Sequence, residues 1–275
     1  MYEILKIRAF TESIREYTFS APLAARRAEP GQFIILRVDE YGERVPFTIC
    51  GADKAAGTVR VLVQTVGATT MKLAACKEGG CVRDIAGPLG RPTDLSEYGK
   101  ILLIAGGIGA AVILPQAEKL AREGRCADTI IGARSAELLV YESDIREFSQ
   151  NLHTVTDDGS AGDKGFVTEK LKVLLDGGKK YDAVFAVGPL MMMKAVAAVT
   201  KEYGLKTVVS MNSLMVDGTG MCGCCRLTVG GKTKYACVDG PEFDGHEVDF
   251  DEAAVRARIY GEQEKSHVCR LKNAH

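Results

Sequence analysis

The sequence predicts an antiparallel β-barrel, followed by a doubly wound parallel α/β sheet and a small cysteine-containing C-terminal module. Three observations predict this order. Short alternating strands separated by turns occupy residues 2–83, strand–helix units occupy residues 101–210, and closely spaced cysteines follow residue 212. Such a change in the pattern of predicted strands and helices is typical of two different architectures joined in one chain. We expect domains at residues 1–95, 96–211 and 212–275.

The barrel is predicted from short runs of alternating or β-branched residues. Turn signals such as Glu29-Pro30-Gly31 separate these runs, and several short strands at this spacing are typical of an antiparallel barrel. A single helix is predicted here, from Thr69 to Lys77, because hydroxyl residues at its start can cap it. The predicted strands are Glu3–Arg8, Glu16–Phe19, Gln32–Val38, Glu43–Ile49 and Thr58–Gln64.

The α/β sheet is predicted from apolar runs that alternate with helical segments. Ile101–Ala105 is continuously apolar, as strands buried on both faces of a parallel sheet are, and a glycine turn and an Ala/Leu-rich helix follow it. This unit repeats, which indicates βαβ crossovers. The repeats are strands at 128–132, 152–156, 183–187 and 207–210 and helices at 137 onward, 167–175 and 190–203.

Composition excludes several classes of function. Lys and Arg total 35 and Asp and Glu total 36, so the net charge of -1 provides no electrostatic footprint for nucleic acid. Charged residues interrupt the first ten positions, and the run Ile101–Gln116 is shorter than the roughly 20 residues of a membrane helix. We therefore expect a cytoplasmic protein with no membrane span. The odd total of 9 cysteines favours a metal or redox site over disulfides.

Two turns of the α/β part are candidates for nucleotide binding. The glycines at 106, 107 and 109 follow the first buried strand and open a helix, where backbone N–H groups can cradle a phosphate. A tight turn for helix–strand packing is the alternative. A second turn, from Gly188 to Met191, also follows a buried strand, and nucleotides bind at the carboxyl ends of such strands.

Two charged residues border the same predicted crevice. Arg134 follows the second strand, where it either faces a ribose phosphate or points to solvent. Asp157 follows the third strand, where it either lines the crevice or closes an ordinary acidic turn. The sequence therefore leaves the choice between NAD and NADP open.

In the barrel, the segment Arg44–Thr48 combines a guanidinium, a proline, an aromatic ring and a hydroxyl. Arg44 can pair with a phosphate, Phe47 can pack on a ring, and Thr48 can hydrogen-bond a ring nitrogen. The alternative is an ordinary edge strand, to which proline is confined within sheets. The segment Gly67–Thr70 opens the predicted helix and is either an anion site or a plain N-cap.

The clearest chemical signal is the loop from Asp217 to Cys225, which is followed by Cys237. Glycines keep this loop small enough for backbone amides to point at sulfur atoms, and clustered thiolates ligate iron. Tetrahedral zinc is the competing interpretation, and a metal-free loop is the weakest of the three. Cys224 is a rival ligand. An acidic stretch at 242–252 is interpreted as a solvated face or a docking surface.

With these parts in this order, the chain resembles the ferredoxin-NADP reductase superfamily. It is more similar to the electron-transfer subunit of two-subunit dihydroorotate dehydrogenases, and most similar to the small subunit of NADH-dependent reduced ferredoxin:NADP oxidoreductase, a bifurcating transhydrogenase. The latter has an aspartate at the first loop position, as Asp217 stands here. The matching segments are Pro30–Phe33, Pro46–Thr48, Gly87–Gly90, Ala105–Gly109 and Val187–Pro189.

The resemblance implies an FAD- and iron–sulfur-containing NAD(P)H oxidoreductase subunit. It implies FAD in the barrel, NAD(H) over the glycine loop, a [2Fe-2S] cluster, a larger flavoprotein partner with iron–sulfur clusters, and ferredoxin as an indirect redox partner. The alternatives are the dihydroorotate dehydrogenase partner and a non-catalytic zinc-stabilised nucleotide-binding regulator.

The resemblance also implies a role for individual residues. Thr48 is the implied catalytic residue, near the reactive nitrogen of the flavin. The superfamily's flavin arginine usually stands one place nearer the aromatic than Arg44 does. The implied flavin residues are Arg44, Val45, Pro46, Phe47, Thr48, Leu62, Val63, Gln64, Gly67, Thr69 and Thr70. The implied nucleotide residues are Gly106, Gly107, Gly109, Arg134, Asp157, Gly188, Pro189 and Met191, and the implied metal ligands are Asp217, Cys222, Cys225 and Cys237.

Overall fold

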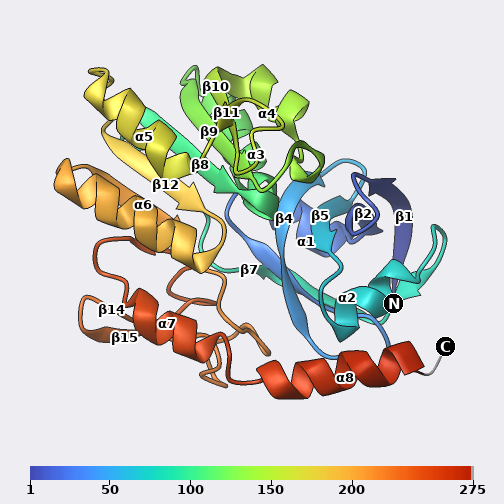
Figure 1. Ribbon diagram of the computed structural model, residues 1–275. Helices are drawn as coiled ribbons and strands as arrows, with labels where there is room; N and C mark the ends of the chain where they lie inside the picture. Colours follow the sequence, from blue (N-terminus) through green and yellow to red (C-terminus); the bar gives the residue numbers. More distant parts are fainter. Residues whose placement is uncertain (274–275) are drawn as a thin grey trace.

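The computed structural model describes residues 1–273 and confirms the predicted order of barrel, α/β sheet and C-terminal part (Figure 1). The barrel is a seven-stranded antiparallel sheet in the order β6-β1-β2-β5-β4-β3-β7. Only Arg83 separates the two end strands along the chain, so the sheet curls into a near-barrel. Its strands are β1 (Tyr2–Ala9), β2 (Ile14–Ser20), β3 (Phe33–Arg37), β4 (Val45–Asp53), β5 (Thr58–Gln64), β6 (Cys81–Val82) and β7 (Asp84–Leu89).

The barrel carries two helices where the sequence predicted one. The predicted helix is α2, which spans Ala68–Ala74 and so begins one residue earlier and ends sooner than expected. The other helix, α1 (Pro22–Arg27), has proline at its start, where a missing N–H costs nothing. Its buried residues are alanines, and so short a segment offers no helical periodicity for a sequence pattern to reveal.

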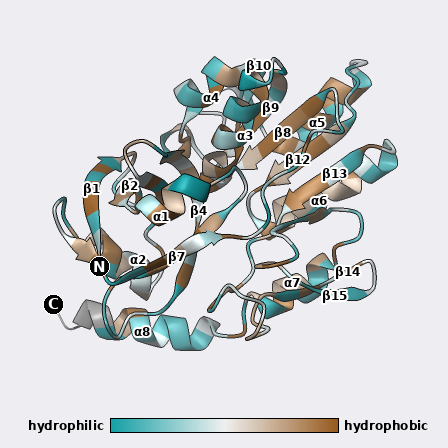
Figure 2. Ribbon diagram, turned by 180° about the vertical axis from the view of Figure 1, so that it is seen from behind, coloured by the Kyte–Doolittle hydropathy of each residue, from teal (hydrophilic) through white to brown (hydrophobic). Residues whose placement is uncertain are grey.

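The second sheet has the order β11-β10-β9-β8-β12-β13-β16, and its first six strands are parallel. Strand β8 is buried along its whole length, and Figure 2 shows it coloured as hydrophobic. Helices α3 and α4 cover one face and α5 and α6 cover the other. The elements are β8 (Ile101–Gly106), α3 (Ala110–Arg122), β9 (Ala127–Ala133), α4 (Glu142–Phe148), β10 (Ser149–Thr156), β11 (Asp163–Lys164), α5 (Val167–Asp176), β12 (Ala183–Val187), α6 (Leu190–Glu202) and β13 (Lys206–Ser210).

The C-terminal part is not a separate body. It contains a hairpin of β14 (Arg226–Val229) and β15 (Lys232–Tyr235), but its next strand, β16 (Glu242–Asp244), joins the α/β sheet antiparallel to β13. Helix α7 (Phe250–Arg256) follows, and α8 (Gly261–Asn273) runs back to the barrel beside α2 (Figure 1). In residues 1–273, no helix combines the length and the apolar character needed to cross a membrane.

The expectation that the acidic stretch at 242–252 is a solvated face is wrong for Glu242. The hydroxyl of Thr93 donates a hydrogen bond to its carboxylate, and the side-chain amide of Gln116 donates to Thr93. Thr93 lies between the barrel and the α/β sheet, and Gln116 lies on α3, so one hydrogen-bonded chain links all three parts. Burial raises the pKa of Glu242 to about 7.

Glu242 should make folding stability depend on pH. Because its pKa is raised from 4.5 to about 7 in the folded chain, the folded state binds this proton more tightly, and stability falls as pH rises through this window. Glu242→Gln keeps an acceptor for Thr93 without the charge. We expect the variant to be more stable than the wild type by up to about 3 kcal/mol at pH 8 and similar to it near pH 5.

Urea unfolding of both chains at the two pH values measures this difference. Glu247→Gln is the matched control, because Glu247 is exposed on the same segment, and it should leave the pH dependence unchanged. An equal difference between Glu242→Gln and wild type at both pH values would contradict the prediction.

Candidate functional site

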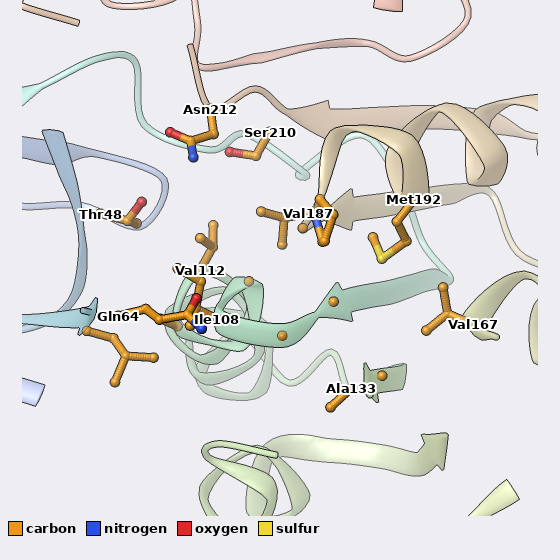
Figure 3. Close-up of a pocket in the computed structure, with 18 of the residues that line it drawn as sticks. Thr48, Gln64, Ile108, Val112, Ala133, Val167, Val187, Met192, Ser210 and Asn212 are labelled. Atoms are coloured by element: carbon orange, nitrogen blue, oxygen red, sulfur yellow. The ribbon is translucent and has the colours of Figure 1, made fainter. Parts of the chain in front are cut away.

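A cavity of about 820 Å³ lies between the barrel and the carboxyl ends of the parallel strands. Side chains from the barrel, from the α/β sheet and from the segment after β13 converge on it (Figure 3). The predicted site residues that line it are Pro46, Phe47, Thr48, Leu62, Gln64, Gly106, Gly107, Gly109, Arg134, Asp157, Gly188, Pro189 and Met191. Residues from both predicted cofactor sites therefore line one cavity.

On the barrel side, the cavity lies where two neighbouring strands separate. Strands β4 and β5 pair from Ile49 and Val61 toward their connecting turn, whereas residues 45–48 of β4 pair with β3 alone. Pro46 therefore stands at a local edge, although β4 as a whole is interior to the sheet. Thr48 and Gln64 project toward the cavity from these two strands (Figure 3).

Alternation along β5 divides its predicted site residues between two faces. Leu62 and Gln64 line the cavity, while the side chain of Val63 is 2% exposed and packs in the barrel core. Successive side chains of a strand point to opposite faces, so Val63 can offer only its backbone to the cavity. Val45 also lies outside the lining residues.

On the α/β side, the two glycine turns pack directly against each other. A Cβ on Gly109 would lie 2.5 Å from the carbonyl oxygen of Val187, and one on Gly188 would lie 3.0 Å from the Cα of Gly106. Packing thus explains these glycines. It does not explain Gly107, which has a φ of +55° and whose added Cβ would meet nothing within 4 Å. Gly107 leaves the backbone of the turn open to the cavity, as a phosphate cradle requires.

The structure adds residues to the site that the sequence argument missed. Ser210, Asn212, Met215 and Pro241 also line the cavity, and Figure 3 shows Ser210 and Asn212 on the side opposite α3. Ser210 ends the last parallel strand, so the rule that ligands bind at the carboxyl ends of strands points to it. Pro241 reaches the cavity only because β16 pairs with β13, which no local pattern reveals.

The cysteine loop packs against the barrel next to this cavity. A Cβ on Gly218 would lie 2.6 Å from Leu89 and 2.8 Å from Ile35, both of which are barrel residues. Asp217 follows the cavity-lining Met215 by two residues, a separation of at most about 7 Å along the chain. The loop and the cavity are therefore neighbours.

The predicted metal ligands are surrounded by backbone N–H donors. The sulfur of Cys225 lies 3.2 Å from that of Cys237 and accepts from the Cys237 N–H at 3.5 Å. The N–H of Cys224 lowers the pKa of Cys222, and the N–H of Thr219 lowers the pKa of Asp217. Burial raises the pKa of Cys237 to about 12, so its thiolate needs a nearby cation.

Cys224 lies near the same set of sulfurs. Burial, followed by the neighbouring Cys222 thiol, raises the pKa of Cys224. Its N–H group already supports Cys222. The two roles, ligand and neighbouring thiol, remain distinct alternatives for this residue.

Helix α8 meets the start of α2, where the sequence left an anion site and a plain N-cap as alternatives. A carboxylate oxygen of Glu264 accepts from the Ala68 N–H at 2.8 Å, and Glu43 lies 3.3 Å from the Thr69 hydroxyl. The Thr70 hydroxyl accepts from the Gly67 N–H at 2.9 Å, so this residue caps the helix. Gly67, Thr69 and Thr70 lie outside the cavity-lining residues, and carboxylates of the chain itself contact this region.

Ligand atoms of Glu43, Glu264 and His267 lie within 4.8 Å of one another. Each carboxylate already accepts from the barrel, and His267 lies 3.3 Å from Glu43, so we interpret the group as a polar contact between α8 and the barrel. Among the residues whose side chains the structure describes, Asp217 and the cysteines form no such compact group of three.

Arg44 does not line the cavity either. Its Nε donates a hydrogen bond of 2.7 Å to the carbonyl oxygen of Val216, the residue that precedes Asp217. The structure thus places this predicted flavin residue at the start of the cysteine loop.

Comparison with known proteins gives a consistent result. Residues 212–249 match the iron–sulfur cluster binding domain of dihydroorotate dehydrogenase B. The chain is 44% identical to a Thermotoga maritima homolog of the dihydroorotate dehydrogenase B (NAD(+)) electron transfer subunit, over 96% of this chain and 93% of the relative. It is 34% identical to the corresponding subunit of Bacillus velezensis, over 86% and 93% of the two chains.

The fold matches solved structures over nearly the whole chain. A chain of the NADH-dependent reduced ferredoxin-NADP oxidoreductase, whose structure addresses flavin-based electron bifurcation, aligns with a TM-score of 0.93 and 41% identity over 98% of both chains. A Neisseria gonorrhoeae ferredoxin NADP+ reductase shares the fold alone, with a TM-score of 0.60 and 18% identity over 74% of this chain and 91% of that chain. The protein therefore belongs to the family of dihydroorotate dehydrogenase B electron transfer subunits, flavin- and iron–sulfur-dependent electron-transfer proteins with a ferredoxin-NADP reductase fold.

Proposed function

We propose that this chain passes electrons between NAD(H), FAD and a [2Fe-2S] cluster to a larger flavoprotein subunit that carries iron–sulfur clusters, with ferredoxin as an indirect redox partner. The observation that carries the proposal is the shared cavity: the barrel strands and both glycine turns line it, and the cysteine loop begins two residues after Met215. Bound FAD would supply the conversion between the two-electron chemistry of a nicotinamide and the one-electron chemistry of a cluster.

In this proposal the barrel residues hold and orient the flavin ring. Pro46 and Phe47 lie at the gap between β4 and β5, and the Thr48 hydroxyl is available to hydrogen-bond a ring nitrogen. Leu62 and Gln64 border the same gap from β5, and Val63 contributes backbone alone. Phosphate groups of FAD would lie toward the start of α2, at Gly67, Thr69 and Thr70.

The α/β residues would hold the dinucleotide. The backbone of Gly106, Gly107 and Gly109 faces the cavity at the start of α3, and Gly188, Pro189 and Met191 line it at the start of α6. Arg134 and Asp157 both line the cavity directly after β9 and β10, so one cation and one anion face the region proposed for the adenosine ribose. NAD(H) is our proposal on the resemblance, since these two charges favour opposite cofactors.

We assign Asp217, Cys222, Cys225 and Cys237 as ligands of a [2Fe-2S] cluster. The sulfurs of Cys225 and Cys237 lie 3.2 Å apart, close enough for both to bind one metal ion. The N–H groups aimed at the sulfurs also suit an iron–sulfur cluster.

A second candidate is an electron-transfer subunit whose partner is a dihydroorotate dehydrogenase. The names of the Thermotoga maritima and Bacillus velezensis relatives favour it, while the aspartate at position 217 favours the transhydrogenase type. Identification of the large subunit that co-purifies from the native source separates the two. We keep 1–95, 96–211 and 212–275 as proposed domains, with β16 of the third completing the sheet of the second.

Chain purified without oxygen should contain bound flavin and close to two irons and two sulfides per molecule. Cys237→Ser should lose the electron paramagnetic resonance signal of the reduced cluster, because the buried thiolate is replaced by a weaker ligand. Cys224→Ser is the matched control in the same loop and should keep the signal. Metal analysis and spectroscopy of the three proteins measure these outcomes.

Two results would contradict this assignment. Stoichiometric zinc with no flavin would favour the zinc-stabilised nucleotide-binding regulator. Loss of the signal in Cys224→Ser, with retention in Cys222→Ser, would show that the ligand set is wrong.

Glu264→Gln should tighten the binding of FAD. The Glu264 carboxylate accepts from the Ala68 N–H, where we propose that the flavin diphosphate binds, so it competes for a donor and repels negative charge. If the substitution removes about 1 kcal/mol of unfavourable binding free energy, the Kd of FAD should fall about fivefold. Riboflavin has no phosphate, so its Kd should not change.

Flavin fluorescence titration of the flavin-free full chain measures both constants. Glu262→Gln is the control, since it removes the same charge from an exposed position on α8. An equal change for FAD and riboflavin, or none for either, would place the diphosphate elsewhere.

A further inference from the structure

Two arginines from different parts of the molecule hold the two ends of the cysteine loop. At the first end, Arg44 donates to the carbonyl oxygen of Val216 at 2.7 Å. At the other end, Arg256 donates to the carbonyl oxygens of Cys224 at 3.1 Å and Arg226 at 2.9 Å. The bonded carbonyls directly precede Asp217 and flank Cys225, which are two of the proposed ligands.

We propose that Arg44 and Arg256 are positioning residues of the cluster: they fix the loop between residues 217 and 225 in the conformation that binds iron, and their charges favour the reduced cluster. The inference rests on the proposed function of this loop. Both residues lie outside residues 212–249, the segment that matches the iron–sulfur domain, so the cluster site extends beyond that domain in this chain.

Arg256 reaches the loop because helix α7 packs along the edge of β14 that faces away from β15. The Asp249 side chain caps this helix by accepting from the N–H groups of Asp251 and Glu252. Glu252 accepts from the Thr228 N–H at 2.9 Å, and Arg256 stands one turn further along the same face. On the edge opposite β15, Val229 of β14 forms an isolated antiparallel bridge with Val248. The Glu252 and Arg256 side chains extend this contact along the same edge.

These contacts revise the interpretation of the acidic stretch. Asp249 and Glu252 have structural partners within the chain, because the Asp249 side chain caps α7 and the Glu252 carboxylate accepts from the hairpin that lies between Cys225 and Cys237. The helix therefore presents Arg256 at a defined position. A guanidinium suits this task because its fork can bond two carbonyls at once, which the single ammonium of lysine does less well.

Anchoring these carbonyls has two physical consequences. A peptide group is planar, so a fixed Cys224 carbonyl also fixes the direction of the Cys225 N–H on the opposite side. Arginine charge beside the loop stabilises the additional electron of a reduced cluster, because hydrogen bonds and net charge around the cluster set its potential. The first effect concerns iron retention and the second concerns the reduction potential.

The test uses the full chain with its cluster and compares Arg44→Met, Arg256→Met and Arg256→Lys with wild type. Loss of supporting contacts around a metal site typically costs 10-fold or more in metal affinity, so both Met variants should lose iron to a chelator about tenfold faster. Their midpoint potentials should shift to more negative values. Arg256→Lys should keep a near-normal potential but lose iron faster than wild type, since it retains the charge without the fork.

Arg258→Met is the matched control, because it removes an exposed arginine two residues beyond Arg256. It should behave as wild type. The proposal would be overturned if Arg44→Met and Arg256→Met lost iron at the same rate as Arg258→Met and had the same midpoint potential. Flavin content and melting temperature of each variant show whether the barrel remains folded.

Hydrogen exchange of the metal-free full chain tests positioning without relying on the cluster. Amides of residues 218–225 should exchange faster in Arg44→Met and Arg256→Met than in wild type or Arg258→Met. Unchanged exchange would refute positioning by these arginines. Absence of iron from the wild type would instead refute the proposed function, and the exchange result would still decide the role of the two arginines.

Discussion

The antiparallel pairing of β16 with β13 is the constraint on which the site depends. Its register joins Ser210 to Glu242, and the Met211 N–H bonds the Pro241 carbonyl at 2.8 Å just beyond it. This strand is drawn from the C-terminal part, yet it completes the edge of the α/β sheet. Because the pairing fixes both ends of the segment between residues 211 and 241, it holds the cysteine loop and hairpin beside the cavity rather than on a free tether.

The same constraint explains why the cavity involves all three parts. A nucleotide site formed at the ends of parallel strands needs a covering surface to exclude water. Here the gap between β4 and β5 provides one wall, and the segment after β13 provides another through Ser210 and Met215. The polar chain from Gln116 through Thr93 to Glu242 joins α3 to β16 through hydrogen-bonded groups that satisfy one another.

Sequence reasoning was most accurate where a structural signal is local. The continuous apolar run of β8 and the glycine turn that follows it are recognised within a few residues. The spacing of Cys222 and Cys225 is equally local, and the proposed ligand set depends on it. It was less complete where a contact joins distant segments. Helix α1 is too short for periodicity, the face of Val63 depends on strand register, and Pro241 reaches the cavity only through a strand added from the C-terminal part.

Arg44 shows the same limit for a single side chain. The residue type matched a flavin-binding pattern, but its position was displaced by one place from that pattern. Neighbouring positions of an extended chain point to opposite sides, so a displacement of one residue redirects the side chain. The structure accordingly bonds Arg44 to Val216 at the start of the cysteine loop. A change of one position can thus leave the composition of the motif the same while the arginine bonds the start of the cysteine loop.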